Sequence, residues 1–174
     1  MPVNPRWQRA ESSDYNLRVK DSSATPAAKV LVGTWDVLGA DARAVREAVF
    51  VIEQAIPRDL EWDQWDATAV HAVAHDAAGR AIGTGRLLPA RFDSDNPATG
   101  HIGRMAVLAD ARRGGVGGMI LARLMQEARR QGFASAALNA QTYVAAFYAG
   151  HGFSAAGPEF LEVGIPHLCM RATL

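Results

Sequence analysis

The chain has 174 residues and a mass of 18.6 kDa, a size at which one domain around one hydrophobic core is expected. Apolar residues make up 49% and charged residues 21%, the balance of a globular protein, which argues against a disordered or fibrous chain. Eighteen basic and eighteen acidic residues give a formal net charge of zero, so the overall charge does not favour a nucleic-acid or anionic-membrane partner.

The cysteine count and the hydropathy of the chain bear on its cellular compartment and on metal or membrane binding. The single cysteine, Cys169, cannot form an intrachain disulfide, and no Cys/His cluster has the spacing of a zinc site. No segment has the roughly 18 apolar residues of a membrane helix, and residues 1–29 hold no apolar run of signal-peptide length. We therefore expect a cytoplasmic protein with no bound metal and no membrane span.

The amino-terminal part lacks a regular hydrophobic pattern. Residues 1–28 are mixed polar and predict a loosely ordered leader. Residues 29–35 are apolar and partly β-branched, and they predict the first strand of a domain over 29–174. Asp41 is then expected to cap a helix that carries apolar residues at Val45, Val49 and Ile52.

The middle of the chain predicts strands. Residues 69–75 and 81–88 flank the turn residues 76–79 and have the pattern of a hairpin. After a polar loop, residues 101–108 have the pattern of another long strand. The sheet therefore has at least four strands at this point of the chain.

The carboxy-terminal half alternates helices and strands. Apolar residues at helical spacing predict a helix over 117–131, which Gly132 ends. A buried strand is predicted over 133–138, a short helix over 142–149 and a final strand over 167–174. This order predicts an α/β domain in which helices cover one sheet.

A glycine-rich loop, residues 112–119, joins the predicted strand at 101–108 to the helix that follows. Glycines let a ligand approach the backbone closely, and the free N–H groups at a helix N-terminus favour an anion such as a pyrophosphate. The alternative is a tight connection with solvated arginines. Six arginines against two acidic residues between positions 104 and 130 give a local net charge of +4, which favours the anion site.

Two common phosphate-binding motifs do not match this loop. A P-loop requires a lysine after its last glycine, but both lysines of the chain, Lys20 and Lys29, lie far upstream. A dinucleotide-binding fingerprint requires G-x-G-x-x-G after the first strand and an acidic residue about 20 positions later, and the loop lacks this arrangement. Nucleoside triphosphate hydrolysis and dinucleotide binding are therefore disfavoured.

Two segments resemble the GNAT superfamily of acyl-CoA N-acyltransferases. Arg112-x-x-Gly115-x-Gly117 is similar to the coenzyme A loop of that family, and residues 101–107 are similar to the strand before it. The run Phe-Tyr-Ala-Gly-His-Gly-Phe at 147–153 resembles a second family signature. Three further segments resemble the small bacterial ElaA-like branch: 49–54, 62–65 and 160–167.

The resemblance implies a single α/β domain with a central mixed sheet, a splayed strand pair and flanking helices. It also implies direct transfer of an acyl group from a thioester to an amine, with acetyl-CoA as the co-substrate and no covalent enzyme intermediate. The implied cofactor-binding residues are the splayed strand, the glycine loop and a glutamine where the family often has asparagine: Met105, Ala106, Val107, Arg112, Arg113, Gly114, Gly115, Val116, Gly117, Gly118 and Gln141.

Catalytic residues follow from the same resemblance. Tyr148 stands where the family places a phenol beside the sulfur, and a phenol that is protonated at neutral pH can donate to a thiolate. Without the motif, a tyrosine beside Phe147 would be assigned to the core. His101 stands where many relatives have glutamate and is the expected general base. Alternative bases are Glu53, Glu162 and His167.

The acceptor side is expected to be acidic. Between Glu53 and Asp66, five acidic residues against one arginine give a net charge of −4, which would attract a protonated amine. A solvated acidic loop explains the same count. Trp62 and Trp65 form either a wall of the site or an anchor on the core. The expected substrate contacts are Glu53, His71 and Glu162.

These residues together predict an N-acetyltransferase that transfers an acetyl group from acetyl-CoA to a primary amine. The acceptor is expected to be a small molecule or a peptide, with neither nucleic acid nor membrane as a partner. The alternative function is a non-catalytic acyl-CoA-binding regulatory module. The oligomeric state stays open, and a homodimer is one option.

Overall fold

The structure, a computed structural model, describes residues 28–93 and 95–174. Nearly all of the expected leader, residues 1–27, lies outside the described residues. The first described element begins at Lys29, where the sequence predicts the first strand.

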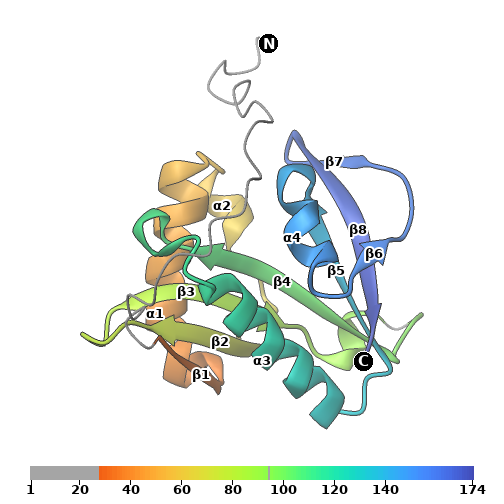
Figure 1. Ribbon diagram of the computed structural model, residues 1–174, viewed down its shortest axis with the longest axis horizontal. Helices are drawn as coiled ribbons and strands as arrows, with labels where there is room; N and C mark the ends of the chain where they lie inside the picture. Colours follow the sequence, from red (N-terminus) through yellow and green to blue (C-terminus); the bar gives the residue numbers. More distant parts are fainter. Residues whose placement is uncertain (1–27, 94) are drawn as a thin grey trace, which may run out of the picture.

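Eight strands form one mixed sheet with the order β1–β2–β3–β4–β5–β8–β6, and β7 pairs with β8 (Figure 1). Every pair is antiparallel except β4 and β5, which run parallel. The prediction of a single α/β domain with a central mixed sheet is confirmed. The strands are β1 Lys29–Gly33, β2 Val70–His75, β3 Ala81–Leu87, β4 Thr99–Val107, β5 Ser135–Gln141, β6 Ser154–Ala155, β7 Phe160–Glu162 and β8 Ile165–Thr173.

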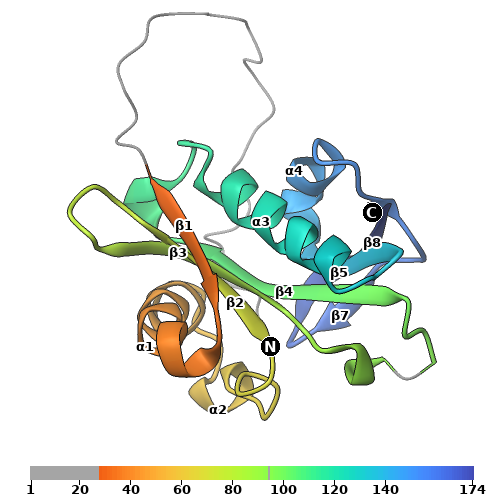
Figure 2. The same ribbon diagram turned by 90° about the horizontal axis from the view of Figure 1, so that it is seen from below.

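Helices cover both faces of the sheet (Figure 2). The helix α1, Trp35–Arg46, and the short α2, Arg58–Glu61, lie on one face, while α3, Val116–Arg130, and α4, Ala145–Ala149, lie on the other. The apolar side of α3 is fully buried against the strands. A π-helix and three 3₁₀ turns complete the helical elements: Glu47–Glu53, Ala90–Phe92, Ala109–Ala111 and Thr142–Val144.

The first helix begins earlier than the sequence predicts. The strand ends at Gly33, and Thr34 occupies the N-cap position of α1, so the expectation that Asp41 caps the helix is wrong. Asp41 lies in the middle of α1, where its carboxylate Oδ2 is 2.8 Å from Nε2 of His75 on β2. The apolar period that starts at Leu38 explains the difference, because Leu38 already packs against the sheet.

The remaining expectations are largely confirmed, with shifted boundaries. The hairpin of β2 and β3 and the helix α3 lie within one or two residues of the predicted ranges. The strand predicted at 133–138 is found at 135–141, because Phe133 packs in the core before the ladder begins. The short strands β6 and β7 were not predicted. Two or three residues are too few to give a hydrophobic period.

The parallel pair of β4 and β5 is very short. It joins only three residue pairs, from Thr99 with Ser135 to His101 with Ala137, after which the two strands separate. Beyond His101, β4 keeps its antiparallel ladder to β3 on one edge and has no strand on the other. The predicted splayed strand pair is therefore present.

None of the helices in the described part of the chain is both long and apolar enough to span a membrane. Within residues 28–93 and 95–174, no group of three or more His, Cys, Asp or Glu side chains is arranged to hold a metal ion.

Candidate active site

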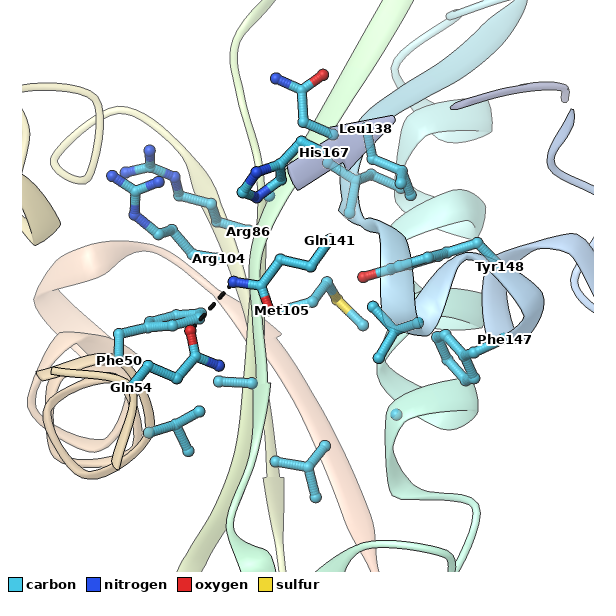
Figure 3. A pocket seen from close by; sticks show the side chains of 18 of the residues that line it. Phe50, Gln54, Arg86, Arg104, Met105, Leu138, Gln141, Phe147, Tyr148 and His167 are labelled. Atoms are coloured by element: carbon cyan, nitrogen blue, oxygen red, sulfur yellow. Dashed lines mark hydrogen bonds between the residues drawn. The ribbon is translucent and has the colours of Figure 1, made fainter. Parts of the chain in front are cut away.

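A cleft of about 930 Å³ opens where β4 and β5 separate, large enough for a drug-sized ligand. Its walls come from β4, the glycine loop and α4, and from the π-helix and the turn between β7 and β8. Figure 3 shows labelled side chains from the π-helix, β3, β4, β5, α4 and β8 projecting into one space. Segments far apart in the sequence thus meet at the end of the parallel pair.

A β-bulge in β4 shapes one wall. Thr84 on β3 pairs with Ala106 and Arg86 pairs with Gly103, so Arg104 and Met105 together oppose Gly85. Arg104 has a left-handed backbone with φ of 52°, a conformation that non-glycine residues rarely adopt. A bulge bends its strand and redirects the side chains, and here it places both Arg104 and Met105 on the cleft.

The predicted cofactor strand lies along this wall. Met105, Ala106 and Val107 all line the cleft, on the part of β4 that has lost its β5 partner. Backbone N–H and C=O groups on such an edge need another partner, because buried unpaired groups are costly. A ligand lying along the edge can supply one.

The glycine loop leads directly into the N-terminus of α3. Gly115 is the N-cap residue and has a left-handed backbone with φ of 80°. The first intrahelical bond runs from the Met119 N–H to the Gly115 carbonyl, so the N–H groups of the three residues between them have no helical partner. No acidic side chain lies in this first turn. The geometry is that of an anion site at a helix N-terminus.

Most predicted loop residues line the cleft, with one exception. The lining residues are Arg112, Arg113, Gly115, Val116, Gly117 and Gly118. Gly114 is not on the cleft wall, so its side of the loop faces elsewhere. A Cβ atom on Gly117 would lie 3.4 Å from Cζ of Phe147 in α4, and one on Gly118 would lie 2.8 Å from Nε2 of His151, just after α4. The helix and the turn after it thus approach the loop closely.

Arg112 is held in place by the opposite side of the cleft. Its Nη1 and Nη2 atoms donate to the two oxygens of Glu53, at 2.8 and 2.6 Å, and its Nε donates to the Val107 carbonyl at 2.9 Å. The bond to Glu53 raises the pKa of Arg112. Both residues are thus at the cleft, as expected, and they bind each other. Their contacts with cofactor and substrate stay predictions.

The π-helix explains how Glu53 reaches this position. Its wide turn shows in the bond from the Gln54 N–H to the Val49 carbonyl, 3.0 Å long and five residues apart. π-turns inside helices are frequent at functional sites. Here the turn brings Phe50, Glu53 and Gln54 to the cleft, and Gln141 on β5 donates to the Gln54 side chain across it at 3.1 Å (Figure 3).

Tyr148 projects its hydroxyl into the cleft from α4, toward Gln141 and Met105 (Figure 3). The residue is 7% exposed, and burial raises the pKa of its phenol to about 12. The ring packs edge-on against Phe147 and Phe153, at centroid distances of 4.9 and 6.1 Å. The surroundings therefore keep the phenol neutral and fix its direction.

Two histidines on the wall each have one ring nitrogen engaged. Nε2 of His101 is 2.9 Å from Oδ2 of Asp93, and Nδ1 of His167 is 2.8 Å from the Ile165 carbonyl. Oxygens of a carboxylate and of a carbonyl accept, so these nitrogens carry the hydrogen and the other nitrogen of each neutral ring has a free lone pair. Both side chains are arranged to accept a proton.

The other two predicted polar contacts differ in position. Glu162 lies on the cleft wall and accepts from Asn139 Nδ2 at 3.4 Å. His71 is fully buried away from the cleft, so the expectation that it binds substrate is wrong. Its Nε2 bonds to the Asp66 carbonyl at 2.9 Å, its ring packs on Trp35, and burial lowers its pKa.

The acidic segment is paired with arginines from elsewhere in the chain. Glu61 and Asp66 bind Arg46 of α1 at 2.5 and 2.7 Å, and Asp63 and Asp66 bind Arg86 of β3 at 2.6 and 2.5 Å. Arg104 of β4 completes this set of three arginines and three carboxylates.

The predicted acidic rim is therefore wrong for these three carboxylates, because equal positive charge lies against them. Glu61 and Asp66 are 3% and 5% exposed. Burial raises the pKa of Glu61 in spite of its arginine neighbours. For Asp63, burial alone would raise the pKa, but Arg86, Arg104 and the hydrogen bond from the Trp65 backbone together outweigh burial and lower it. A net count along the sequence omits arginines that the fold brings in from other strands.

The two tryptophans have different roles. The Arg43 and Arg46 guanidinium carbons lie 4.3 and 4.6 Å from the ring centre of Trp62, which anchors the acidic segment on α1. Trp65 lines the cleft and packs edge-on against Phe92 at 5.4 Å. Of the two alternatives that the sequence left open, Trp62 is an anchor on α1 and Trp65 is part of the cleft wall.

Sequence reasoning missed several lining residues. Phe50 and Gln54 lie in the segment 49–54 that resembles the ElaA-like branch, but the resemblance assigned them no contact. Phe92 carries no motif, and Asn139 is a single polar residue on β5. Arg86 did give a signal, since it is the one charged residue in an otherwise small and apolar strand. Such a residue is buried only when it is paired.

Comparisons with known proteins agree with this geometry. Residues 39–174 match the family model of the GNAT acetyltransferase domain. The uncharacterized N-acetyltransferase YjcF of Bacillus subtilis is 38% identical over 131 residues, which cover 75% of this chain and 89% of that protein. Among solved structures, an acyl-CoA N-acyltransferase from Pseudomonas aeruginosa is 29% identical with a TM-score of 0.72, over 84% of this chain and 99% of that one. Escherichia coli ElaA shares the fold, with a TM-score of 0.73 at 22% identity over 83% of this chain and 99% of that one.

The ion-pair cluster predicts a large stability effect. Arg46→Met leaves the buried Glu61 and Asp66 carboxylates without this partner, so the free energy of unfolding should fall by about 3–5 kcal/mol. The measurement is urea denaturation followed by tryptophan fluorescence. Arg43→Met is the matched control on the same helix, because Arg43 is exposed and contacts Trp62 without an ion pair. Equal losses in the two variants would contradict the role assigned to the cluster.

The glycine loop gives a second prediction. Gly115→Val and Gly132→Val place the same side chain at opposite ends of α3, at φ of 80° and 85°, with open space around both positions. The left-handed strain should cost about 1–2 kcal/mol of stability in each. Only Gly115→Val should weaken coenzyme A binding, because only its side chain enters the cleft. Calorimetric titration measures this, and unchanged affinity in folded Gly115→Val would exclude the loop as the binding site.

Proposed function

The chain belongs to the GNAT acetyltransferase family and is an acyl-CoA N-acyltransferase, and from that premise we propose that it transfers an acetyl group from acetyl-CoA to the nitrogen of a primary amine. The acceptor in this proposal is a small molecule or a peptide, and neither nucleic acid nor a membrane is a partner. One observation carries it: the free N–H groups at the start of α3 and the Tyr148 hydroxyl face the same cleft.

The described residues fit a coenzyme A thioester, which supplies an activated acyl group and a thiolate leaving group. The first turn of α3, with Arg113 beside it, offers donors to the pyrophosphate. The unpaired edge of β4 from Met105 to Val107 offers backbone partners to the amide groups of the pantetheine arm. A backbone N–H on this edge can also stabilise negative charge on the thioester oxygen.

The amine must lose a proton before it can attack, because an ammonium has no lone pair. His101 is the proposed base, with Asp93 holding its Nε2–H so that Nδ1 can accept the proton. Asp93 also favours the imidazolium that forms. His167, whose Nδ1–H is held by the Ile165 carbonyl, is the alternative.

Tyr148 is the proposed general acid. A phenol with a pKa near 12 is fully protonated at neutral pH and can donate to the departing thiolate. The hydrophobic packing of Phe147 and Phe153 around the ring holds the hydroxyl on the cleft side. Proton loss at one end of the cleft and proton gain at the other complete the transfer without a covalent enzyme intermediate.

Replacement of Tyr148 by phenylalanine tests this role. Tyr148→Phe keeps the ring packing, so the dissociation constant of coenzyme A should change little, while kcat should fall by about 10²- to 10⁴-fold. Thiol release from acetyl-CoA over a panel of amines measures kcat. Tyr143→Phe removes the hydroxyl of the other tyrosine on the cleft wall, which is 67% exposed, and is the control: it should keep kcat near the wild-type value.

Wild-type turnover in Tyr148→Phe would show that another group protonates the thiolate. Coenzyme A binding with no thiol release for any amine, in the unmodified protein, would instead support the non-catalytic acyl-CoA-binding module. Because the pKa of Tyr148 is raised, its protonated form persists as pH increases, and activity should show no loss from this group below about pH 11.

The pH profile identifies the base. A histidine base accepts a proton only in its neutral form, so kcat/KM should rise with pH as the imidazole loses its proton. His101→Ala should flatten this part of the profile, and Asp93→Asn should reduce the rate with less change in shape. His167→Ala is measured in parallel. Flattening in His167→Ala with a normal profile in His101→Ala would move the assignment to His167.

A further inference from the structure

Two arginines occupy the acceptor end of the cleft and have no part in the chemistry above. Arg86 projects from β3 and Arg104 from the bulge of β4, and both line the cleft. Figure 3 shows their guanidinium groups together, on the side of the cleft opposite Tyr148 and near Phe50. A substrate that reaches the thioester from this end must pass them.

The arginines have donors that the protein does not use. Arg86 binds Asp63 and Asp66 through Nη1 and Nη2, while its Nε is buried and has no partner. Arg104 donates to the Glu61 carbonyl through Nε and Nη2, at 3.2 and 3.1 Å, and forms ion pairs with the Glu61 carboxylate through Nε at 3.2 Å and with Asp63 through Nη2 at 3.4 Å. Within the described residues its Nη1 has no hydrogen bond. Arg86 is only 4% exposed, and orphaned donors at that depth are rare in native proteins.

The backbone of Arg104 has a strained conformation at the point where its side chain enters the cleft. A φ of 52° in a strand is unfavourable for an arginine, and such residues persist where the surrounding structure demands them, often at ligand sites. The bulge turns the side chain from the plane of the sheet toward the cleft, where it stays 26% exposed. Glycine would adopt this positive φ with less strain, so the arginine at this position indicates a function for its side chain.

The local electrostatics favour an added anion at Arg104. Burial and the neighbouring Arg86 and Arg46 lower the pKa of Arg104, against the opposite effect of Glu61 and Asp63. Its present partners therefore do not fully replace the lost hydration. Asp63 is itself held at both oxygens by Arg86, at 2.8 and 2.6 Å, so it does not neutralise Arg104 alone.

The remaining wall at this end adds little negative charge. Asp93 is bound to His101, and Trp65, Phe92 and His167 carry no negative charge. Glu162 lies on the wall with Asn139 as its partner and is exposed to solvent. Glu61 and Asp63 also line the cleft, but Arg46 shares Glu61 and Arg86 shares Asp63. The free Nη1 edge of Arg104 can therefore take an added planar anion, and a carboxylate matches a guanidinium in charge and in plane.

We propose that Arg104, supported by Arg86, binds a carboxylate of the acceptor, so that the substrate is a small primary amine that also carries a carboxylate. This proposal rests on the proposed function, since it names the class of amine that the same site takes. Arg104 is a substrate-binding residue in this account, and the buried Arg86 holds it through the shared Asp63.

The test compares amines that differ in this one group. For the full chain, kcat/KM is measured with acetyl-CoA for β-alanine and γ-aminobutyrate, for their primary amides and for the alkylamines that lack the carboxylate. Each value is divided by the fraction of neutral amine, so that differences in amine pKa are removed. The carboxylates should exceed their amides by about tenfold or more, the effect of one charge-assisted hydrogen bond.

Substitution locates the preference. Arg104→Gln should reduce the ratio of carboxylate to amide to about twofold or less, through the loss of carboxylate turnover, with amide turnover maintained. Arg58→Gln is the matched control, because Arg58 forms an exposed pair with Glu47 outside the cleft, and it should keep the wild-type ratio. If Arg104→Gln fails to fold, the wild-type comparison and Arg104→Lys still decide the matter. Arg104→Lys keeps the charge but lacks the guanidinium group that carries the free Nη1, so the ratio should fall, and an unchanged ratio would contradict the site.

The outcomes separate this inference from the proposed function. Acetylation of amides as fast as carboxylates overturns the carboxylate site and leaves the N-acetyltransferase intact. A carboxylate preference that persists in Arg104→Gln also overturns it. No thiol release with any amine, in protein that binds coenzyme A, overturns both proposals together.

Discussion

The separation of β4 from β5 is the constraint on which the site depends. Three residue pairs hold the two parallel strands together, and beyond His101 the edge of β4 has backbone groups with no strand beside them. An unpaired edge inside a protein is unfavourable unless a ligand completes it. The separation of the two strands thus opens the cleft and also leaves backbone groups that a ligand can pair with. The glycine loop and α4 lie on two sides of this cleft (Figure 1).

A second constraint holds the acceptor side in place. The segment that carries Glu61, Asp63 and Asp66 has little regular structure, and the arginines of α1, β3 and β4 fix it against the sheet. Removal of a single partner from buried ion pairs is costly, so the cluster is mutually dependent. It also positions Arg104 at the cleft, so the proposed carboxylate site depends on the same ion pairs as the stability of the domain.

Much of this arrangement was predictable, for identifiable reasons. The hydrophobic periods, such as the long one of α3, predicted the α/β architecture. The glycine loop and the Phe147–Phe153 signature are local in sequence, and their resemblance to the family implied the position of Tyr148 at the cleft. Pairings over 20 to 60 positions, such as Glu53 with Arg112 and Asp63 with Arg86, leave no local pattern. For that reason the sequence predicts a negatively charged rim at the acceptor side and a substrate contact by His71, and neither prediction accounts for the partners that the fold supplies. The π-helix and the bulge at Arg104 change the direction of side chains by one residue, which periodicity does not reveal.

The most direct test of the account is a map of where coenzyme A meets the backbone. Amide proton and nitrogen chemical shifts of the protein, recorded during titration with coenzyme A, report this residue by residue. The account predicts the largest shifts at the free edge of β4, from Met105 to Val107, and in the first turn of α3, from Val116 to Gly118. Largest shifts along β1 and β2, with these two segments unchanged, would contradict it.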